Sequence, residues 1–105
     1  MHKCKITVVK ISLNQDLIDK YFLEEYKSIS ICDQFTEGQE FIIDPATIQK
    51  PPENFCNWAW ADIRNTLVCI SSGGTMEGIN HKNSALVGCS DWSRPVYFLI
   101  ERIED

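Results

Sequence analysis

The sequence lacks any cluster of basic side chains. Its 10 lysines and arginines are scattered singly among 15 acidic residues, and the formal net charge is −5. Proteins that bind nucleic acids carry a basic patch or stripe, and docking on an anionic membrane also needs clustered lysine or arginine. We therefore predict that neither a nucleic acid nor a membrane surface is a partner of this protein.

Long apolar runs are also missing. No stretch approaches the roughly 20 apolar residues of a membrane-spanning helix. The apolar run after Lys5 is shorter and more β-branched than the core of a signal peptide. The five cysteines are an odd number and contain no Cys-x-x-Cys pair, so no local zinc-ribbon or redox motif is present. These features predict a cytoplasmic protein with reduced thiols.

The remaining pattern predicts a single domain over residues 1–105. The hydrophobic content of 44% allows a core of its own at this length. Alternating β-branched residues predict a central strand over 3–12 with two apolar faces. Helical spacing after Asn14, a plausible N-cap, predicts an amphipathic helix over 15–27. Further strands are expected at 28–31, 39–43, 85–89 and 96–103, the last two as an antiparallel hairpin.

A central helix is predicted over residues 54–71. Pro52 prevents an earlier start, and Gly73 provides a C-terminal cap before a polar loop at 72–83. One apolar stripe along this helix consists of Phe55, Ala59, Ile63, Leu67 and Ile70. The expected fold class is α+β: a mainly antiparallel sheet of about four or five strands, open or partly closed into a barrel, packed on this helix.

The start of the central helix is apolar on two sides, because Trp58 and Trp60 lie about 200° apart around it. Such a helix is either buried in the domain or half in a subunit interface. The two indoles therefore fill the core or an interface, or they form a flat wall of a ligand pocket. Together with the aromatic turn at Trp92, they predict a homo-oligomer.

Three motifs resemble those of a family of small prokaryotic proteins of about 100 residues that is frequent in anaerobes. They read GQEF at residues 38–41, FC-x-WAW-x-DI at 55–63 and RPV-x-F-x-IERI at 94–103. The resemblance spans most of the chain and implies no particular activity. It places cysteines of the family pattern at Cys32, Cys56 and Cys89. This chain has Asp33 and Gly88 where the family commonly has proline and a further cysteine, so a fourth thiol near Cys89 is absent.

The three family cysteines have competing interpretations. Cys32 is expected in a turn, Cys56 at a helix N-terminus and Cys89 at a strand end. They are small buried hydrophobes, or thiolate ligands of a metal such as zinc or an iron–sulfur cluster, or reactive thiols. Cys4 and Cys69 are expected to fill the core.

Three charged residues have expected partners. Asp62 is surrounded by apolar residues, and Arg94 is its expected partner, either in a buried ion pair or in a pair that binds a polar ligand. Asp91 is expected to bond the backbone of its own turn.

Two functions follow from these residues. The first is a non-enzymatic module that binds a small ligand, a metal or a protein partner in a pocket around Cys56, Trp60 and Cys89. The alternative is a redox or nucleophilic thiol enzyme that uses Cys56 or Cys89. The candidate ligand-binding residues are Cys32, Cys56, Trp58, Trp60, Asp62, Cys89 and Arg94.

Overall fold

A four-stranded antiparallel sheet and two helices make up the computed structural model, which describes residues 1–103. The elements in chain order are β1 (Cys4–Ile11), α1 (Gln15–Tyr21), the 3-10 turn η1 (Glu24–Tyr26), β2 (Glu40–Ile43), the 3-10 turn η2 (Pro45–Thr47), α2 (Asn57–Ser71), β3 (Ser84–Gly88) and β4 (Val96–Arg102). The strand order is β2-β1-β4-β3. The α+β prediction is confirmed, and the sheet is open: within residues 1–103, β2 and β3 are its edges and do not pair with each other.

The strand β1 is central, as predicted, but only one of its faces is buried. Cys4, Ile6 and Val8 point into the core, and a bulge after Val8 shifts the register against β4. On the opposite face, Lys5 forms ion pairs of 3.6 Å with Glu40 and 3.8 Å with Glu101. Antiparallel sheets commonly keep one face in water, so the prediction of two apolar faces overestimated the burial of this strand.

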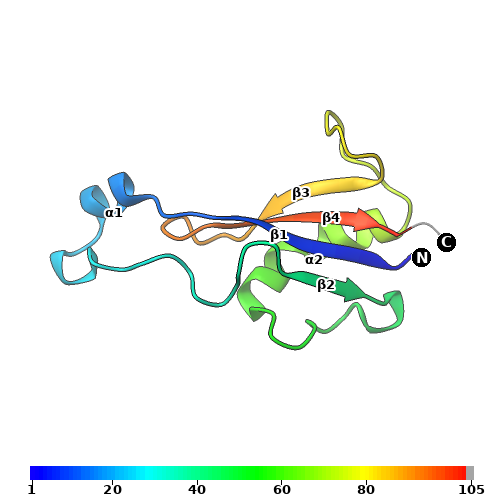
Figure 1. Ribbon diagram of the computed structural model, residues 1–105, viewed down its shortest axis with the longest axis horizontal. Helices are drawn as coiled ribbons and strands as arrows, with labels where there is room; N and C mark the ends of the chain where they lie inside the picture. Colours follow the sequence, from blue (N-terminus) through cyan, green and yellow to red (C-terminus); the bar gives the residue numbers. More distant parts are fainter. Residues whose placement is uncertain (104–105) are drawn as a thin grey trace.

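The helix α2 covers the face of the sheet that carries Cys4, Ile6 and Val8 (Figure 1). The predicted stripe of Phe55, Ala59, Ile63, Leu67 and Ile70 is buried throughout. The helix starts at Asn57, three residues later than predicted, because Asn54 adopts a φ of 67° and Phe55 closes a turn on Pro52. It ends at Ser71 as predicted, and Gly73 follows with a φ of 104°.

Four phenylalanines and Trp60 form an aromatic cluster between α2 and the sheet. Ring centroids lie 4.9 Å apart for Phe41 and Phe55, 5.1 Å for Phe35 and Phe98, and 5.4 Å for Phe55 and Trp60. Most of the pairs are edge-on, the arrangement that aromatic quadrupoles favour. Because Phe35 belongs to a loop and Phe55 precedes α2, the cluster fixes that loop beside the start of the helix.

The helix α1 lies far from α2, at the end of an extension that we call the arm, residues 12–31 (Figure 1, left), where Phe22 packs on Trp92 of the turn between β3 and β4. The molecule is accordingly elongated, at 50 × 30 × 21 Å. The predicted helix over 15–27 is too long: α1 ends at Tyr21, Phe22 is extended with a ψ of 153°, and η1 follows. The strand predicted at 28–31 is wrong, because the chain there is irregular.

The five cysteines are all free. Cys4 is 1% exposed in the core, as expected. Cys69 lies on the outer side of α2 and is exposed, so the expectation that it fills the core was wrong. Within residues 1–103, no helix has the length and apolar character needed to cross a bilayer.

Candidate ligand cleft

Three segments meet where the arm joins the sheet, and they enclose a cleft of about 750 Å³. The segments are the loop around residues 32–35, the beginning of α2 and the turn at 89–94. Pockets for small molecules usually measure about 300–1,000 Å³, so the volume suits a ligand. Six of the seven predicted site residues line this cleft: Cys32, Cys56, Trp58, Asp62, Cys89 and Arg94.

The two tryptophans of α2 lie in opposite environments. Trp58 lines the cleft and is 83% exposed, whereas Trp60 is 4% exposed and packs against Phe55 in the core. Core packing is therefore confirmed for Trp60, and the ligand-pocket wall stays a prediction for Trp58, which lies on the wall of the cleft. The buried indole N–H of Trp60 has no hydrogen-bond partner within residues 1–103, contrary to the usual pattern for tryptophan.

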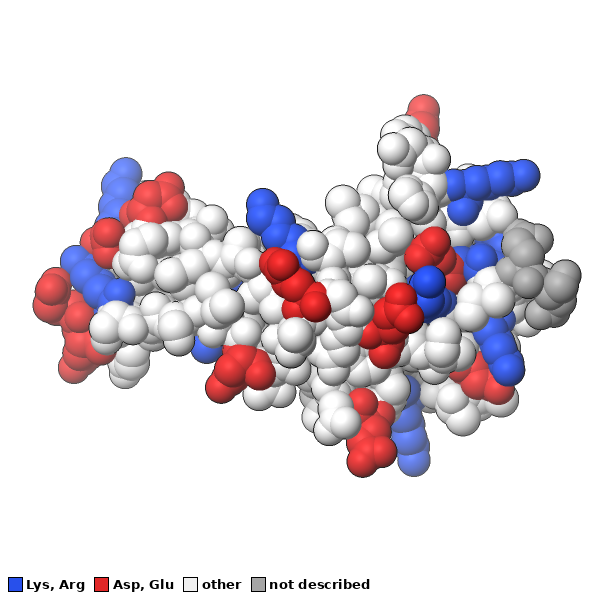
Figure 2. Space-filling view, in the orientation of Figure 1, with Lys and Arg blue, Asp and Glu red and all other residues white. Residues whose placement is uncertain are grey.

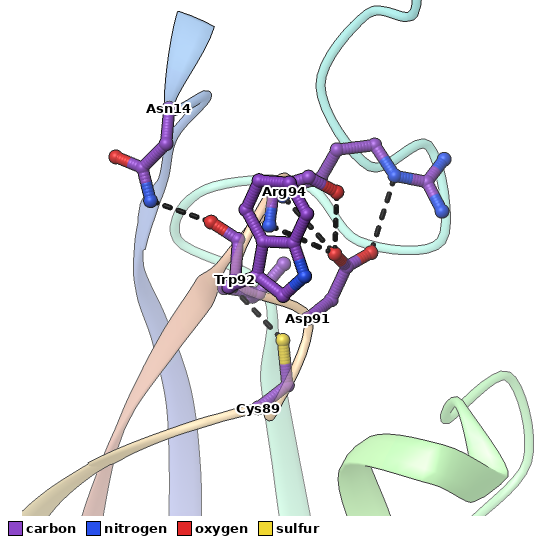
Figure 3. A network of polar contacts seen from close by, with 7 residues as sticks. Asn14, Cys89, Asp91, Trp92 and Arg94 are labelled. Carbon is purple, nitrogen blue, oxygen red and sulfur yellow. Dashed lines mark hydrogen bonds and ion pairs between the residues drawn. The ribbon is translucent and has the colours of Figure 1, made fainter. Parts of the chain in front are cut away.

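The turn at 89–94 is organised by the carboxylate of Asp91 (Figure 3). Its Oδ1 accepts hydrogen bonds from the backbone N–H of Ser93 at 3.0 Å, from Ser93 Oγ at 2.6 Å and from the backbone N–H of Arg94 at 3.3 Å. Its Oδ2 pairs with Arg94 Nε at 3.2 Å. Partial burial raises the pKa of Asp91, but these bonds and the guanidinium charge outweigh it and lower the pKa overall. The predicted bonding of Asp91 to its own turn is confirmed.

The predicted ion pair between Asp62 and Arg94 is not formed. Asp62 Oδ2 instead accepts a hydrogen bond from the backbone N–H of Ser90 at 2.7 Å, which ties α2 to the turn. Arg94 pairs with Asp91, only three residues away, and so short a loop costs little entropy to close. Only Nε of the guanidinium has a partner in the described part of the chain, and the terminal nitrogens point away from Asp91 (Figure 3).

The structure brings Cys32, Cys56 and Cys89 to the same cleft from three separate segments. All three are half-buried. Cys89 Sγ accepts a hydrogen bond from the backbone N–H of Val96 at 3.3 Å, and Cys56 is the N-cap of α2 without a side-chain capping bond. No group of three His, Cys, Asp or Glu side chains in residues 1–103 is arranged to hold a metal ion. The thiolate site for zinc or an iron–sulfur cluster therefore stays a prediction without geometric support.

Trp92 is a cleft residue that the sequence did not identify as part of the site. Its ring lines the cleft and packs edge-on against Phe22, with centroids 5.0 Å apart. Its carbonyl accepts a hydrogen bond from Asn14 Nδ2 at 2.6 Å (Figure 3). The available signal was a large aromatic side chain in a polar turn, which indicates a contact surface. Through Trp92, the wall of the cleft continues onto the arm.

The polar groups of the cleft offer both donors and acceptors. Asp62 and Asp91 contribute two negative charges and Arg94 one positive charge, so the formal charge of the lining residues is −1. The charges of Asp91 and Arg94 largely neutralise each other. For a ligand, Asp62 therefore offers a hydrogen-bond acceptor and the terminal nitrogens of Arg94 offer donors.

Comparisons of the chain with models of protein families, with curated proteins and with solved structures find no match. The family resemblance suggested by the three sequence motifs remains a prediction.

Proposed function

We propose that the protein is a binding module that holds a small organic ligand in the cleft between α2 and the turn at 89–94. The observation that carries this proposal is the position of Trp58, whose side chain is 83% exposed on the wall of the cleft. Burying a large apolar side chain is worth about 1.5–3 kcal/mol. A ligand that covers this indole would gain much of that free energy.

The lining residues indicate the chemistry of the ligand. Trp58 and Trp92 favour a flat apolar group, because aromatic faces stack on planar partners. Arg94 can donate from its terminal nitrogens, and Asp62 Oδ1 has no partner within residues 1–103 and can accept. We expect a planar compound that carries at its edge both a hydrogen-bond donor and an acceptor.

The thiol-enzyme alternative has weaker support. A nucleophilic cysteine is usually activated by an adjacent base, and no histidine is among the residues in 1–103 that line the cleft. His81 bonds to Asn80 in the loop at 72–83. The five free thiols agree with the reducing cytoplasm that we propose as the location of the protein.

Titration with three naphthalene compounds tests the proposal: the 2-carboxamide, which carries both a donor and an acceptor, and the 2-carboxylate and the 2-methylammonium, which each carry only one of the two. We expect chemical-shift changes at the indole N–H groups of Trp58 and Trp92, with little change at the buried Trp60. Trp58→Ala should weaken binding about tenfold or more, because about 1.4 kcal/mol corresponds to a factor of ten.

Met76→Ala is the matched control, because Met76 is an exposed apolar side chain in a different surface hollow. It should leave the affinity unchanged. The proposal would be wrong if none of the three compounds shifted Trp58 at about 1 mM, a weak affinity. Equal loss of binding in both variants would also contradict it.

A further inference from the structure

The cleft belongs to a larger aromatic surface that reaches onto the arm. Tyr26 packs on Phe22 with centroids 6.2 Å apart, Phe22 packs on Trp92, and Trp92 lines the cleft with Trp58. We call Trp58, Trp92, Phe22 and Tyr26 the aromatic face. Its exposed fractions are 83% for Trp58, 44% for Trp92 and 55% for Tyr26. Exposed apolar side chains that gather in this way mark an interaction surface.

Few of the apolar side chains on the arm are buried by the rest of the chain. Its helix α1 has seven residues, and a helix of that length is marginal in water without packing. Ile18 is its one buried residue, whereas Tyr21 and Leu23 are each about two-thirds exposed. The radius of gyration is 15.0 Å, while a compact chain of this length would have about 13 Å. The arm therefore lacks the contacts that a compact domain would supply.

We infer that a second copy of this chain covers the aromatic face. The two copies are related by a two-fold axis that lays the arm of each across the cleft of the other. In such an interface the same surface serves both partners, so exposed apolar side chains of each arm can pack on the Trp58 and Trp92 side chains of the partner's cleft. The partner's arm then closes the ligand cleft, a consequence that rests on the proposed function.

The exposed area approaches what a stable dimer needs. Aromatic side chains can bury about 150–250 Å² each. At the observed exposures of Trp58, Tyr21, Tyr26 and Trp92, they offer roughly 500 Å² together. Leu23 and Ile31, both at least half exposed, bring this area toward the ~800 Å² per partner of a standard interface.

The outer face of the sheet is the competing surface, and it is less suited to a dimer. It exposes Ile42 and Leu86, but Lys5 crosses it between Glu40 and Glu101 in two ion pairs. Interfaces are enriched in tyrosine and tryptophan, and the large aromatic side chains exposed within residues 1–103 lie on the arm and the cleft and not on the strands. In the view of Figure 2, the arm has most of its charges near its tip, and a largely uncharged surface separates them from the charges of the sheet region.

Sedimentation velocity on the full chain, between about 1 and 100 μM, tests this inference. We expect a species of twice the 12.1 kDa chain mass. The double variant Tyr21→Asp with Leu23→Asp should sediment as a monomer, and so should Trp58→Asp, because each places buried charge in the interface. Leu86→Asp is the control on the outer sheet face and should remain a dimer. Circular dichroism verifies that each variant is folded.

A monomeric wild type at every concentration would overturn the inference, and so would a dimer that only Leu86→Asp dissociates. The naphthalene titration separates this result from the proposed function. A monomer that still binds one of the compounds through Trp58 would refute the dimer and leave the ligand cleft intact. A dimer that fails to bind them would retain the interface and refute the ligand.

Discussion

Asn14 is the N-cap residue of α1, but its side chain does not cap the helix. The helix has no side-chain capping bond at Asn14, and the Nδ2 of this residue donates to the carbonyl of Trp92 instead. The side chain therefore links the start of the arm to the turn beside the cleft. An N-cap needs a side-chain acceptor, whereas this link needs a donor, so the two roles can be separated by substitution.

Asn14→Asp should destabilise the protein by about 1 kcal/mol, since it removes the donor to the Trp92 carbonyl. Aspartate is as good an N-cap as asparagine, and its charge is favourable at a helix N-terminus. A capping role would therefore predict no loss. Urea unfolding measures the change. Asn57→Asp, an exposed change at the start of α2, is the control and should be neutral or slightly stabilising. No loss for Asn14→Asp would show that the link is unimportant.

The sequence predicted which residues line the cleft better than it predicted which of them form ion pairs or hydrogen bonds with each other. Cys32, Cys56 and Cys89 were selected because they match the cysteines of the family pattern and were expected at the ends of elements, and the structure places all three in the lining of one cleft. The pairing of Asp62 with Arg94 was wrong. Asp62 accepts a hydrogen bond from the backbone N–H of Ser90, and Arg94 pairs with Asp91 in its own turn. Sequence alone does not show where the free N–H groups of a turn will point.

At the level of elements, the helix α2 was predictable and the arm was not. The buried stripe of α2 has helical period, and Pro52 and Gly73 bracket it. The segment 15–27 also has helical spacing, but only Ile18 finds a buried site. The helical spacing of apolar residues predicts which side of a helix can be buried. It does not predict whether the fold supplies a surface that covers this side. This is why α1 is shorter than its pattern suggested.

Phe22→Ala should release the arm locally and leave the sheet intact. The ring of Phe22 contacts both Trp92 and Tyr26, and an aromatic pair is worth about 0.5–1.5 kcal/mol beyond its buried area. We expect faster amide hydrogen exchange over residues 15–27, with unchanged protection in β1 and β4. Equal acceleration in the arm and the sheet would mean that the two unfold as one unit.

At the scale of the whole molecule, the sheet follows from a few local rules. The hairpin of β3 and β4 and the central position of β1 were both predicted from apolar pattern and sequence order. The elongated shape was not predicted, because it depends on where the chain between β1 and β2 travels. That segment contributes Phe35 to the core cluster, which includes no residue of α1.

Labelling of the thiols should rank the cysteines by their place in this architecture. Cys69 is exposed on α2, and Cys4 is 1% exposed at the beginning of the central strand. Alkylation with iodoacetamide, followed by peptide mass spectrometry, should modify Cys69 first and Cys4 last. Cys4 should react only at the rate that global unfolding allows. Fast labelling of Cys4 in the folded protein would contradict the central position of β1.

The same thiol makes stability depend on pH. Burial raises the pKa of Cys4, and the hydrogen bond with Ser71 and the charge of Arg102 only partly offset it. The folded state therefore keeps the proton that the unfolded state loses above its ordinary pKa of about 8.5. The stability that the protonated Cys4 thiol gives the folded state is fully present below that pH and is lost as the pH rises. We expect the free energy of unfolding to fall as the pH rises above about 8.5, and to fall less steeply in Cys4→Ala. Identical slopes in the two proteins would show that the Cys4 thiol ionises as easily in the folded chain as in the unfolded one.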